Sequence, residues 1–305
     1  MSHRTDYQLK DVLKYNKDGS VDARQTRYNH LTKFIAHMQS ERGYASHWNL
    51  NKLGKKEIHR YVRDLKDKGL EHRTIENKLG AIRWLATKIN RGQFIPSNRD
   101  CGLKKREFST ENKAVRLTPG HLASMDDRMQ LINRLKAEFG LREKEAVKFD
   151  HRYATQSVGK IQLKDNWCKN GRPRSIEIVN DRQVQLLQEV EKFQKEYAGE
   201  HFKKTGSYSM IPDIKQMKYN AYRKQVQDVS NEIGIKGHSF RHQWAQDRFK
   251  ELSGLDCPIA NGPKYSELSQ EQKSKWDVAA GIVNQELGHG KDRLDTTATY
   301  IGIRS

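Results

Sequence analysis

The chain has 305 residues, a formal net charge of +19 and a pI near 9.7. Its length allows two domains, each with a core of its own. Its evenly spread basic residues favour a polyanion such as DNA as partner. No apolar run reaches the roughly 18 residues that span a membrane. A polar N-terminus and three scattered cysteines argue against a secretory signal and a disulfide framework, and together they predict a cytoplasmic protein.

The first third of the chain predicts a helical domain, which we assign to residues 1–91. Residues 1–20 are polar, and we expect them to be ordered only on contact with a partner. Apolar residues at helical spacing predict a helix from Asp22, a second over about residues 55–68 that ends at Gly69, and a third from about Arg73. The expected apolar face of the first helix consists of Tyr28, Leu31, Phe34, Ile35 and Met38.

Residues 92–117 contain Gly and Pro, the basic run Lys104-Lys105-Arg106 and little apolar periodicity, which indicates a basic linker. A helix is then expected from Thr118-Pro119. Alternating apolar residues between Tyr153 and Val179, with Asn170-Gly171 as the turn, predict a small antiparallel hairpin. Helices resume near residue 181 and over 220–233, so residues 118–305 predict a second, helical domain with a small sheet. The fold class is therefore mainly α (α+β).

Four short segments in this second domain hold residues that can act on a phosphodiester. They are Gly140-Leu141-Arg142-Glu143-Lys144-Glu145, Lys169 in the basic turn, Gly237-His238-Ser239-Phe240-Arg241-His242, and Leu287-Gly288-His289 followed by Tyr300. Two arginines can clamp a phosphate, a lysine or histidine can move protons, and a tyrosine hydroxyl can act as a nucleophile. Each segment alone also fits an ordinary solvated helix face or loop, and only the set points to cutting and rejoining of DNA without a metal.

In this order, Gly-Leu-Arg-x-x-Glu, His-x-x-Arg-His and Leu-Gly-His…Thr-x-x-Tyr resemble the tyrosine recombinases, the family of phage and mobile-element integrases, over about residues 118–301. The resemblance implies that Arg142 and Arg241 clamp the phosphate and that Tyr300 attacks it. It also implies no cofactor or metal. The remaining implied roles are a general acid at Lys169, with Lys164 and Lys160 as rivals, a proton acceptor or hydrogen-bonding partner at His238, a phosphate contact at His289, and supporting roles for Glu145 and His242.

The same resemblance implies a two-domain clamp on duplex DNA with inverted half-sites, a homotetramer on paired sites, and accessory DNA-bending proteins as further partners. The protein is expected in the bacterial cytoplasm in association with the nucleoid, where it integrates or excises a mobile element. Residues 71–79 are expected to form the DNA-facing helix of the first domain. The predicted DNA contacts are Arg73, Lys78, Lys104, Lys105, Arg106, Arg172 and Arg174.

The sequence also departs from the family pattern. His289 and Tyr300 are 11 residues apart, a slightly wider spacing than is usual, and residues 253–285 read as a surface insertion. Because only five residues follow Tyr300, we expect that exchange of a C-terminal helix between protomers is minimal, is replaced by a contact of another element, or involves residues outside the given sequence. The short segment before the first helix predicts no separate arm-binding domain. The alternatives are a type IB topoisomerase, a hairpin-forming resolvase, or a non-catalytic DNA-binding protein with this fold.

Overall fold

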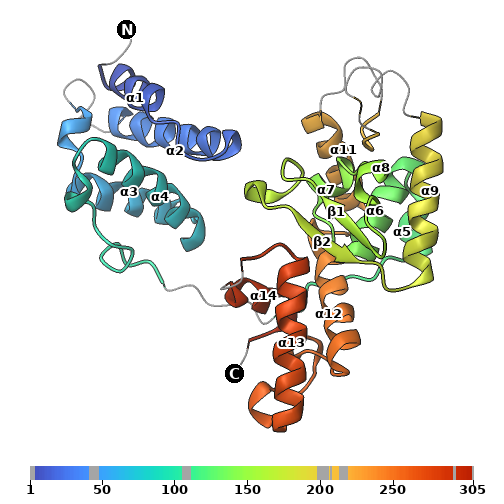
Figure 1. Ribbon diagram of the computed structural model, residues 1–305. Coiled ribbons are helices and arrows are strands. Elements are labelled where there is room, and N and C mark those ends of the chain that lie inside the picture. Colours follow the sequence, from blue (N-terminus) through green and yellow to red (C-terminus); the bar gives the residue numbers. More distant parts are fainter. Residues whose placement is uncertain are drawn as a thin grey trace. The chain divides into compact units, whose positions relative to one another are not determined.

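The computed structural model describes residues 4–40, 48–104, 111–197, 206, 208–212, 219–290 and 293–303. The chain divides into two compact units, Met1–Glu107 and Phe108–Ser305, each with its own hydrophobic core (Figure 1). The division falls inside the segment that we predicted as the linker. Within the described ranges, no helix has the length and apolar character needed to cross a membrane.

The described part of the first unit contains the helices α1 (Arg4–Tyr15), α2 (Val21–Ser40), α3 (Lys55–Asp67) and α4 (His72–Lys88). The predicted face of α2 is buried except for Tyr28, which is 41% exposed. Our expectation for residues 1–20 was wrong for α1, because Leu9 is buried in the core and the Thr5 hydroxyl donates to the carbonyl of Trp48 at 2.9 Å. Leu9, Val12 and Leu13 have helical spacing and pack on the first core, so the sequence carried a signal for α1 that we missed.

The predicted linker is shorter than residues 92–117, because its first part belongs to the first unit. Cys101 and Leu103 are buried in the first core, and Nζ of Lys66 donates to the carbonyls of Cys101 and Gly102 at 2.9 and 3.0 Å. At the other end, residues 111–117 lie on the second unit, where the Val115 amide donates to the carbonyl of Ser239 at 3.3 Å. We call residues 111–117 the leading segment of the second unit.

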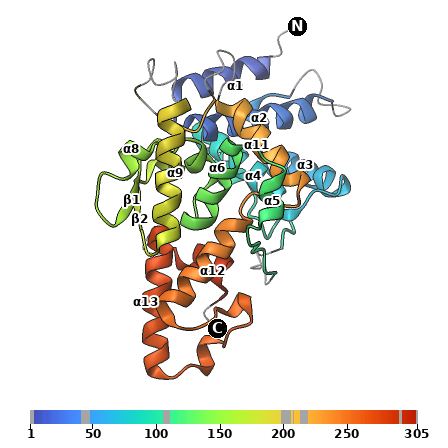
Figure 2. The same ribbon diagram turned by 90° about the vertical axis from the view of Figure 1, so that its right-hand side faces the viewer.

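The described part of the second unit is helical around a two-stranded antiparallel sheet (Figures 1 and 2). Its elements are α5 (Pro119–Ala123), α6 (Asp127–Phe139), α7 (Glu143–Val147), α8 (His151–Ala154), β1 (Lys160–Leu163), β2 (Arg174–Glu177), α9 (Asp181–Tyr197), α11 (Tyr219–Glu232), α12 (Ser239–Ser253), α13 (Gln270–Glu286) and α14 (Leu294–Ile301). The hydroxyl of Thr118 caps α5, as the Thr-Pro pair predicted.

The strands pair from Lys160 opposite Glu177 to Leu163 opposite Arg174, so the predicted sheet is confirmed but its tight Asn-Gly turn is not. Residues 164–173 connect the strands and include a 3₁₀ helix, Lys169–Gly171. Trp167 and Cys168 are buried, which draws this longer connection onto the body of the unit.

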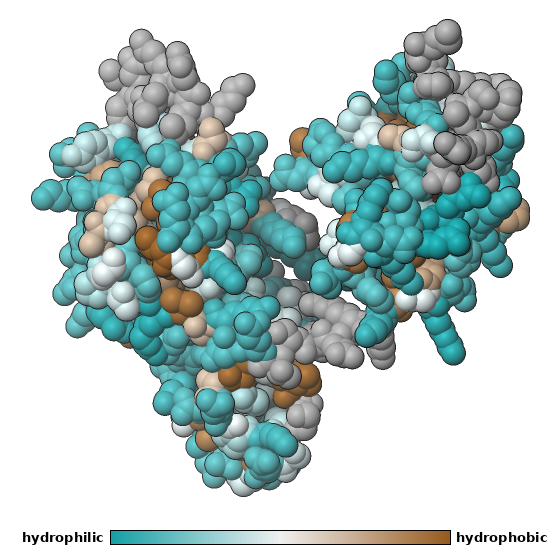
Figure 3. Space-filling model, turned by 180° about the vertical axis from the view of Figure 1, so that it is seen from behind, coloured by the Kyte–Doolittle hydropathy of each residue, from teal (hydrophilic) through white to brown (hydrophobic). Residues whose placement is uncertain are grey.

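The reading of residues 253–285 as a surface insertion was wrong. Cys257, Leu268 and Trp276 in this stretch are buried in the core of the second unit, and about half of the stretch forms α13. This helix packs along α12 (Figure 2). The rings of Phe249 and Trp276 meet edge to face between the two helices at 5.5 Å. The short α14 packs against both helices, so α13 is part of the frame that holds the end of the chain. Hydrophilic side chains cover most of the visible face of each unit (Figure 3).

Candidate active site

Arg142 lies at the N-cap of α7. Its backbone amide donates to Oε2 of Glu145 at 2.7 Å, and its Nη1 donates to Oε1 at 2.9 Å. The chain reaches this position through Gly140, which ends α6 with φ +58°; a Cβ atom there would lie 2.4 Å from the ring of Trp244. Glycine is required at this turn for both reasons.

Arg241 is almost fully buried on α12, with 1% of its surface exposed. Its guanidinium donates to the carbonyls of Gly140 and Leu287. Nη2 of Arg142 donates to the same Leu287 carbonyl at 3.1 Å. Both guanidinium groups therefore lie within hydrogen-bonding distance of a single oxygen atom. The structure brings the two predicted clamp residues together although they are almost a hundred residues apart in sequence.

Arg241 keeps its charge despite this environment. Burial, followed by the nearby charges of Arg142 and Arg174, lowers the pKa of Arg241 to about 9, which leaves it cationic at pH 7. Its Nε is buried and has no hydrogen-bond partner among the described residues. A cluster of cations with an unused donor is a favourable environment for an anion.

Glu145 is the buried counter-ion of this group, with none of its side chain exposed. It binds Arg174 in bidentate fashion, through Nη1 to Oε1 and Nη2 to Oε2, both at 2.7 Å. Burial alone would raise the pKa of Glu145, but hydrogen bonds and charge from Arg174, together with Arg241 and Arg142, hold it at about 2. Glu145 thus holds two arginines of the cluster, Arg142 and Arg174, at once.

Direct contact between Arg174 and DNA, which we expected, does not fit its burial. The Arg174 side chain is 4% exposed, and its Nε donates to the carbonyl of Glu286 at 2.6 Å, so each of its three nitrogens is bonded within the protein. Gly288, with φ +67°, packs against it; a Cβ atom there would lie 2.8 Å from Cδ of Arg174. Arg174 therefore joins β2 to the end of α13, which precedes His289.

Tyr300 lies on α14 beside the arginine cluster and is 8% exposed. Its ring centre is 5.7 Å from Cζ of Arg241 and 5.7 Å from the ring centre of His289. The ring of His242 stacks on it at 4.4 Å with a tilt of 31°. The predicted nucleophile, one clamp arginine and two histidines are thus neighbours.

A chain of hydrogen bonds holds the ring of His289. Its Nδ1 lies 3.0 Å from the hydroxyl of Thr297, and this hydroxyl donates to Oδ1 of Asn284 at 2.7 Å. Because a hydroxyl has one hydrogen, Nδ1 of His289 is the donor, and Nε2 of the neutral ring carries a free lone pair.

The three histidines of the site are neutral at pH 7 in the DNA-free protein. Burial, followed by the charges of Arg241 and Arg142, lowers the pKa of His289 to about 3 and that of His238 to about 4. His238 stands at the N-cap of α12 with part of its ring open to solvent. Burial and the neighbouring His238 lower the pKa of His242 to about 4.

Lys169 is exposed on the 3₁₀ helix between the strands. Its rival Lys164 is engaged elsewhere, with Nζ 4.1 Å from the ring centre of Tyr153 and 5.3 Å from that of Trp167. These cation–π contacts hold Lys164 against the body of the unit. The arrangement favours Lys169 over Lys164 as the lysine that can move to a substrate.

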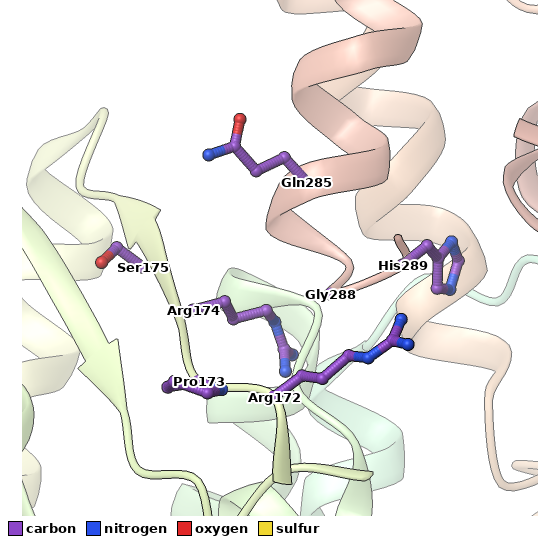
Figure 4. A pocket seen from close by; sticks show the side chains of 7 residues that line it. All are labelled: Arg172, Pro173, Arg174, Ser175, Gln285, Gly288 and His289. Carbon is purple, nitrogen blue, oxygen red and sulfur yellow. The ribbon is translucent and has the colours of Figure 1, made fainter. Parts of the chain in front are cut away.

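Arg172 reaches the site from the same connection. It lines an open pocket with His289, and its side chain extends toward the histidine (Figure 4). A Cβ atom at Gly290 would lie 3.2 Å from Nη1 of Arg172, so the guanidinium lies beside the backbone that follows His289. The other residues that line the pocket are Pro173, Arg174, Ser175, Gln285 and Gly288.

On the first unit, the predicted DNA contact Lys78 belongs to a cationic cluster with His30 and Lys33 of α2, which we did not predict as DNA contacts. Burial and then Lys33 lower the pKa of Lys78, and burial, followed by Lys78 and Lys33, lowers the pKa of His30. The spacing of basic residues along α2 is the sequence signal that could have identified this face of the helix. A like-charged cluster suits a phosphate backbone.

The other predicted DNA contacts of the first unit are Arg73, Lys104, Lys105 and Arg106. Arg73 is exposed and pairs with Glu76 at 3.1 Å, and Lys104 is exposed where its backbone amide donates to Nδ1 of His72 at 2.8 Å. Lys105 and Arg106 lie outside the described residues. Across the described ranges, no group of three or more His, Cys, Asp or Glu side chains is placed to hold a metal ion.

Residues 108–247 match the family model described as Integrase. None of the curated proteins matches the chain in sequence. The chain is thus similar to the integrases over just under half of its length, a stretch that holds Arg142, Lys169 and Arg241.

Solved structures of site-specific recombinases and integrases share the fold. The XerH site-specific recombinase, bound to its palindromic difH substrate after cleavage, is 17% identical with a TM-score of 0.59, over 97% of this chain and 81% of that one. A lambda integrase dimer on a COC′ core site is 12% identical with a TM-score of 0.58, over 98% and 93%. The Tn1549 transposon integrase on transposon right-end DNA is 15% identical with a TM-score of 0.55, over 98% and 95%.

Proposed function

We propose that this chain is a site-specific recombinase that cuts and rejoins duplex DNA through a 3′-phosphotyrosyl intermediate and serves the integration or excision of a mobile element. One observation carries the proposal: Arg142 and Arg241 donate to the same carbonyl oxygen, that of Leu287, and Arg241 lies 5.7 Å from the ring of Tyr300. Two converging guanidinium groups beside a tyrosine are suited to a phosphate under attack.

In the proposed reaction the Tyr300 oxygen attacks the scissile phosphorus, and the bond to the 5′-oxygen breaks. Arg142 and Arg241 neutralise the non-bridging oxygens as charge accumulates. Lys169 gives a proton to the departing 5′-oxygen. Attack by a 5′-hydroxyl of a partner strand on the phosphotyrosine reverses these steps, restores the phosphodiester and frees Tyr300, so the bond energy is retained throughout.

The neutral histidines supply the proton acceptors that this scheme needs. His238 at the start of α12 and His289, with its free Nε2 lone pair, are both available to accept the phenol proton at pH 7. After a phosphate anion is bound, the charges that depress the pKa of His289 are offset, and a protonated ring can donate to the phosphate. His242, stacked on Tyr300, orients the ring.

The test is Tyr300→Phe, with Tyr265→Phe as a matched control. Tyr265 is a second tyrosine of the same unit, and its hydroxyl donates to Asp277. On a nicked target duplex, the Tyr300 variant should form no covalent protein–DNA band on a denaturing gel and should bind DNA as the wild type does, because affinity rests on many phosphate contacts. The Tyr265 variant should give the full band. A full band from Tyr300→Phe would assign the nucleophile elsewhere.

The proposed partner is duplex DNA with inverted half-sites, bound by a homotetramer that pairs two sites, with accessory DNA-bending proteins, in the bacterial cytoplasm in association with the nucleoid. The net charge of +19, the His30–Lys33–Lys78 cluster and the palindromic substrate of XerH support this proposal. Light scattering of the protein on its target DNA should give the mass of four protomers on two duplexes. An active, strictly monomeric complex that relaxes supercoils would favour a topoisomerase.

A further inference from the structure

The side chain of Gln246 joins two distant parts of the second unit. It lies on α12, one turn after His242, and is 7% exposed. Its Nε2 donates to Oδ1 of Asn112 at 2.8 Å and to the backbone carbonyl of Tyr300 at 3.3 Å. The amide nitrogen has two hydrogens, so both bonds can form together.

The bond from Gln246 gives the carbonyl of Tyr300 a hydrogen-bond partner that α14 itself does not provide. The last four carbonyls of a helix have no partner within it, and the carbonyl of Tyr300 is one of these because α14 ends at Ile301. A helix of eight residues is too short to be stable by itself, so contacts from outside fix its position. Gln246 provides such a contact at the backbone of Tyr300, and His242 provides another at its ring.

The bond to Asn112 brings in the leading segment, where the chain arriving from the first unit meets the second. Asn112 is exposed, and its Oδ1 also accepts the amide of Ala114 at 3.0 Å, which sets the side chain in a local turn. The Val115 amide then donates to Ser239 at the start of α12. Nη2 of Arg116 also donates to Oδ1 of Asp247 on α12 at 3.0 Å. The leading segment is thus tied to α12 at three points, and the bond from Gln246 shares its donor with Tyr300.

We propose that Gln246 is a positioning residue that couples the leading segment, through Asn112, to the placement of the Tyr300 helix. Through this coupling, the position of Tyr300 depends on the conformation of the leading segment. This inference rests on the proposed role of Tyr300 as the nucleophile.

Four substitutions test the coupling. Gln246→Met keeps the shape of the side chain and removes both donors, and Asn112→Ala removes the acceptor at an exposed position where folding is not at risk. Asn112→Asp keeps an acceptor oxygen. Gln243→Met is the matched control, because Gln243 is a glutamine of the same helix that donates to the exposed Asp247 at 3.0 Å and to neither Asn112 nor Tyr300. Asp247 also accepts a bond from Arg116, and this variant leaves that bond in place.

The first measurement is the rate of covalent-complex formation at saturating nicked DNA. Gln246→Met and Asn112→Ala should each slow it about 10-fold or more, since a misplaced nucleophile is costly. The double variant should be no slower than Gln246→Met alone, as residues of one coupled unit behave. Asn112→Asp and Gln243→Met should react at the wild-type rate. Wild-type rates for both Gln246→Met and Asn112→Ala would overturn the proposal, as would a defect in Gln246→Met alone.

The second measurement does not depend on the chemistry. Amide hydrogen exchange of a peptide covering residues 294–303 should be faster in Gln246→Met and Asn112→Ala than in the wild type and Gln243→Met. Unchanged exchange in either variant would overturn the coupling even if the enzyme cuts DNA. If the wild type forms no covalent complex, the proposed function fails, whereas the exchange rates still decide whether Asn112 and Gln246 hold α14.

Discussion

Glu145→Gln is expected to destabilise the second unit strongly, because it removes the only carboxylate that Arg142 and Arg174 share among the described residues of the site. The pKa of Glu145 falls from its ordinary value of 4.5 to about 2 in the folded protein. By linkage this corresponds to about 3 kcal/mol of stability at pH 7. The loss of one partner from a buried ion pair has a similar cost, about 3–5 kcal/mol.

The effect of Glu145→Gln should depend on pH in a defined direction. Because the carboxyl has a lower pKa in the folded protein than in the unfolded chain, its contribution is complete above about pH 4.5 and is lost as the pH falls toward 2. At pH 3 the difference between wild type and variant should shrink to about 1 kcal/mol. Glutamine has no charge to lose, so the variant contributes no pH dependence at this position.

Urea unfolding followed by tryptophan fluorescence measures this difference, since Trp167, Trp244 and Trp276 all belong to the second unit. Glu189→Gln is the control, because Glu189 also pairs with an arginine, Arg134, but its side chain is 50% exposed. The free energy of unfolding of the Glu189→Gln control should fall by less than about 1 kcal/mol. A loss in Glu145→Gln no larger than in the control, or one that is the same at pH 7 and pH 3, would refute the role of Glu145 as buried counter-ion.

Two further predictions concern the chemistry. Arg142→Lys and Arg241→Lys should each slow cleavage by on the order of 100-fold, because a point charge does not reproduce the fork of two donors; cleavage of a nicked duplex at the wild-type rate by either variant would exclude a bidentate clamp. Lys169→Ala should cleave normal DNA slowly and a 5′-bridging phosphorothiolate substrate almost normally, because a thiolate leaves without a proton. An equal defect on both substrates would move the general acid to Lys160 or a histidine.

The parts of this protein that were predicted from the sequence are those encoded locally. The apolar faces of α2, α3 and α4 follow helical spacing, and the Thr118 cap follows from residues next to one another. The motif residues Arg142, Arg241 and Tyr300 could be named because each lies in a short segment of characteristic amino-acid sequence. Helix α1 was missed although Leu9, Val12 and Leu13 have helical spacing. The connection around Trp167 was missed because its conformation depends on burial against distant residues.

Only the tertiary structure decided how the named residues meet. The carbonyl of Leu287 that receives both arginines is a backbone atom, and no side-chain pattern identifies it. Arg174 was expected on DNA but closes on Glu145, because a buried carboxylate among cations takes the nearest bidentate partner. Gln246 reaches Asn112 across 134 residues of sequence. Such contacts form only when separate helices pack together, whereas periodicity and motifs describe each segment by itself.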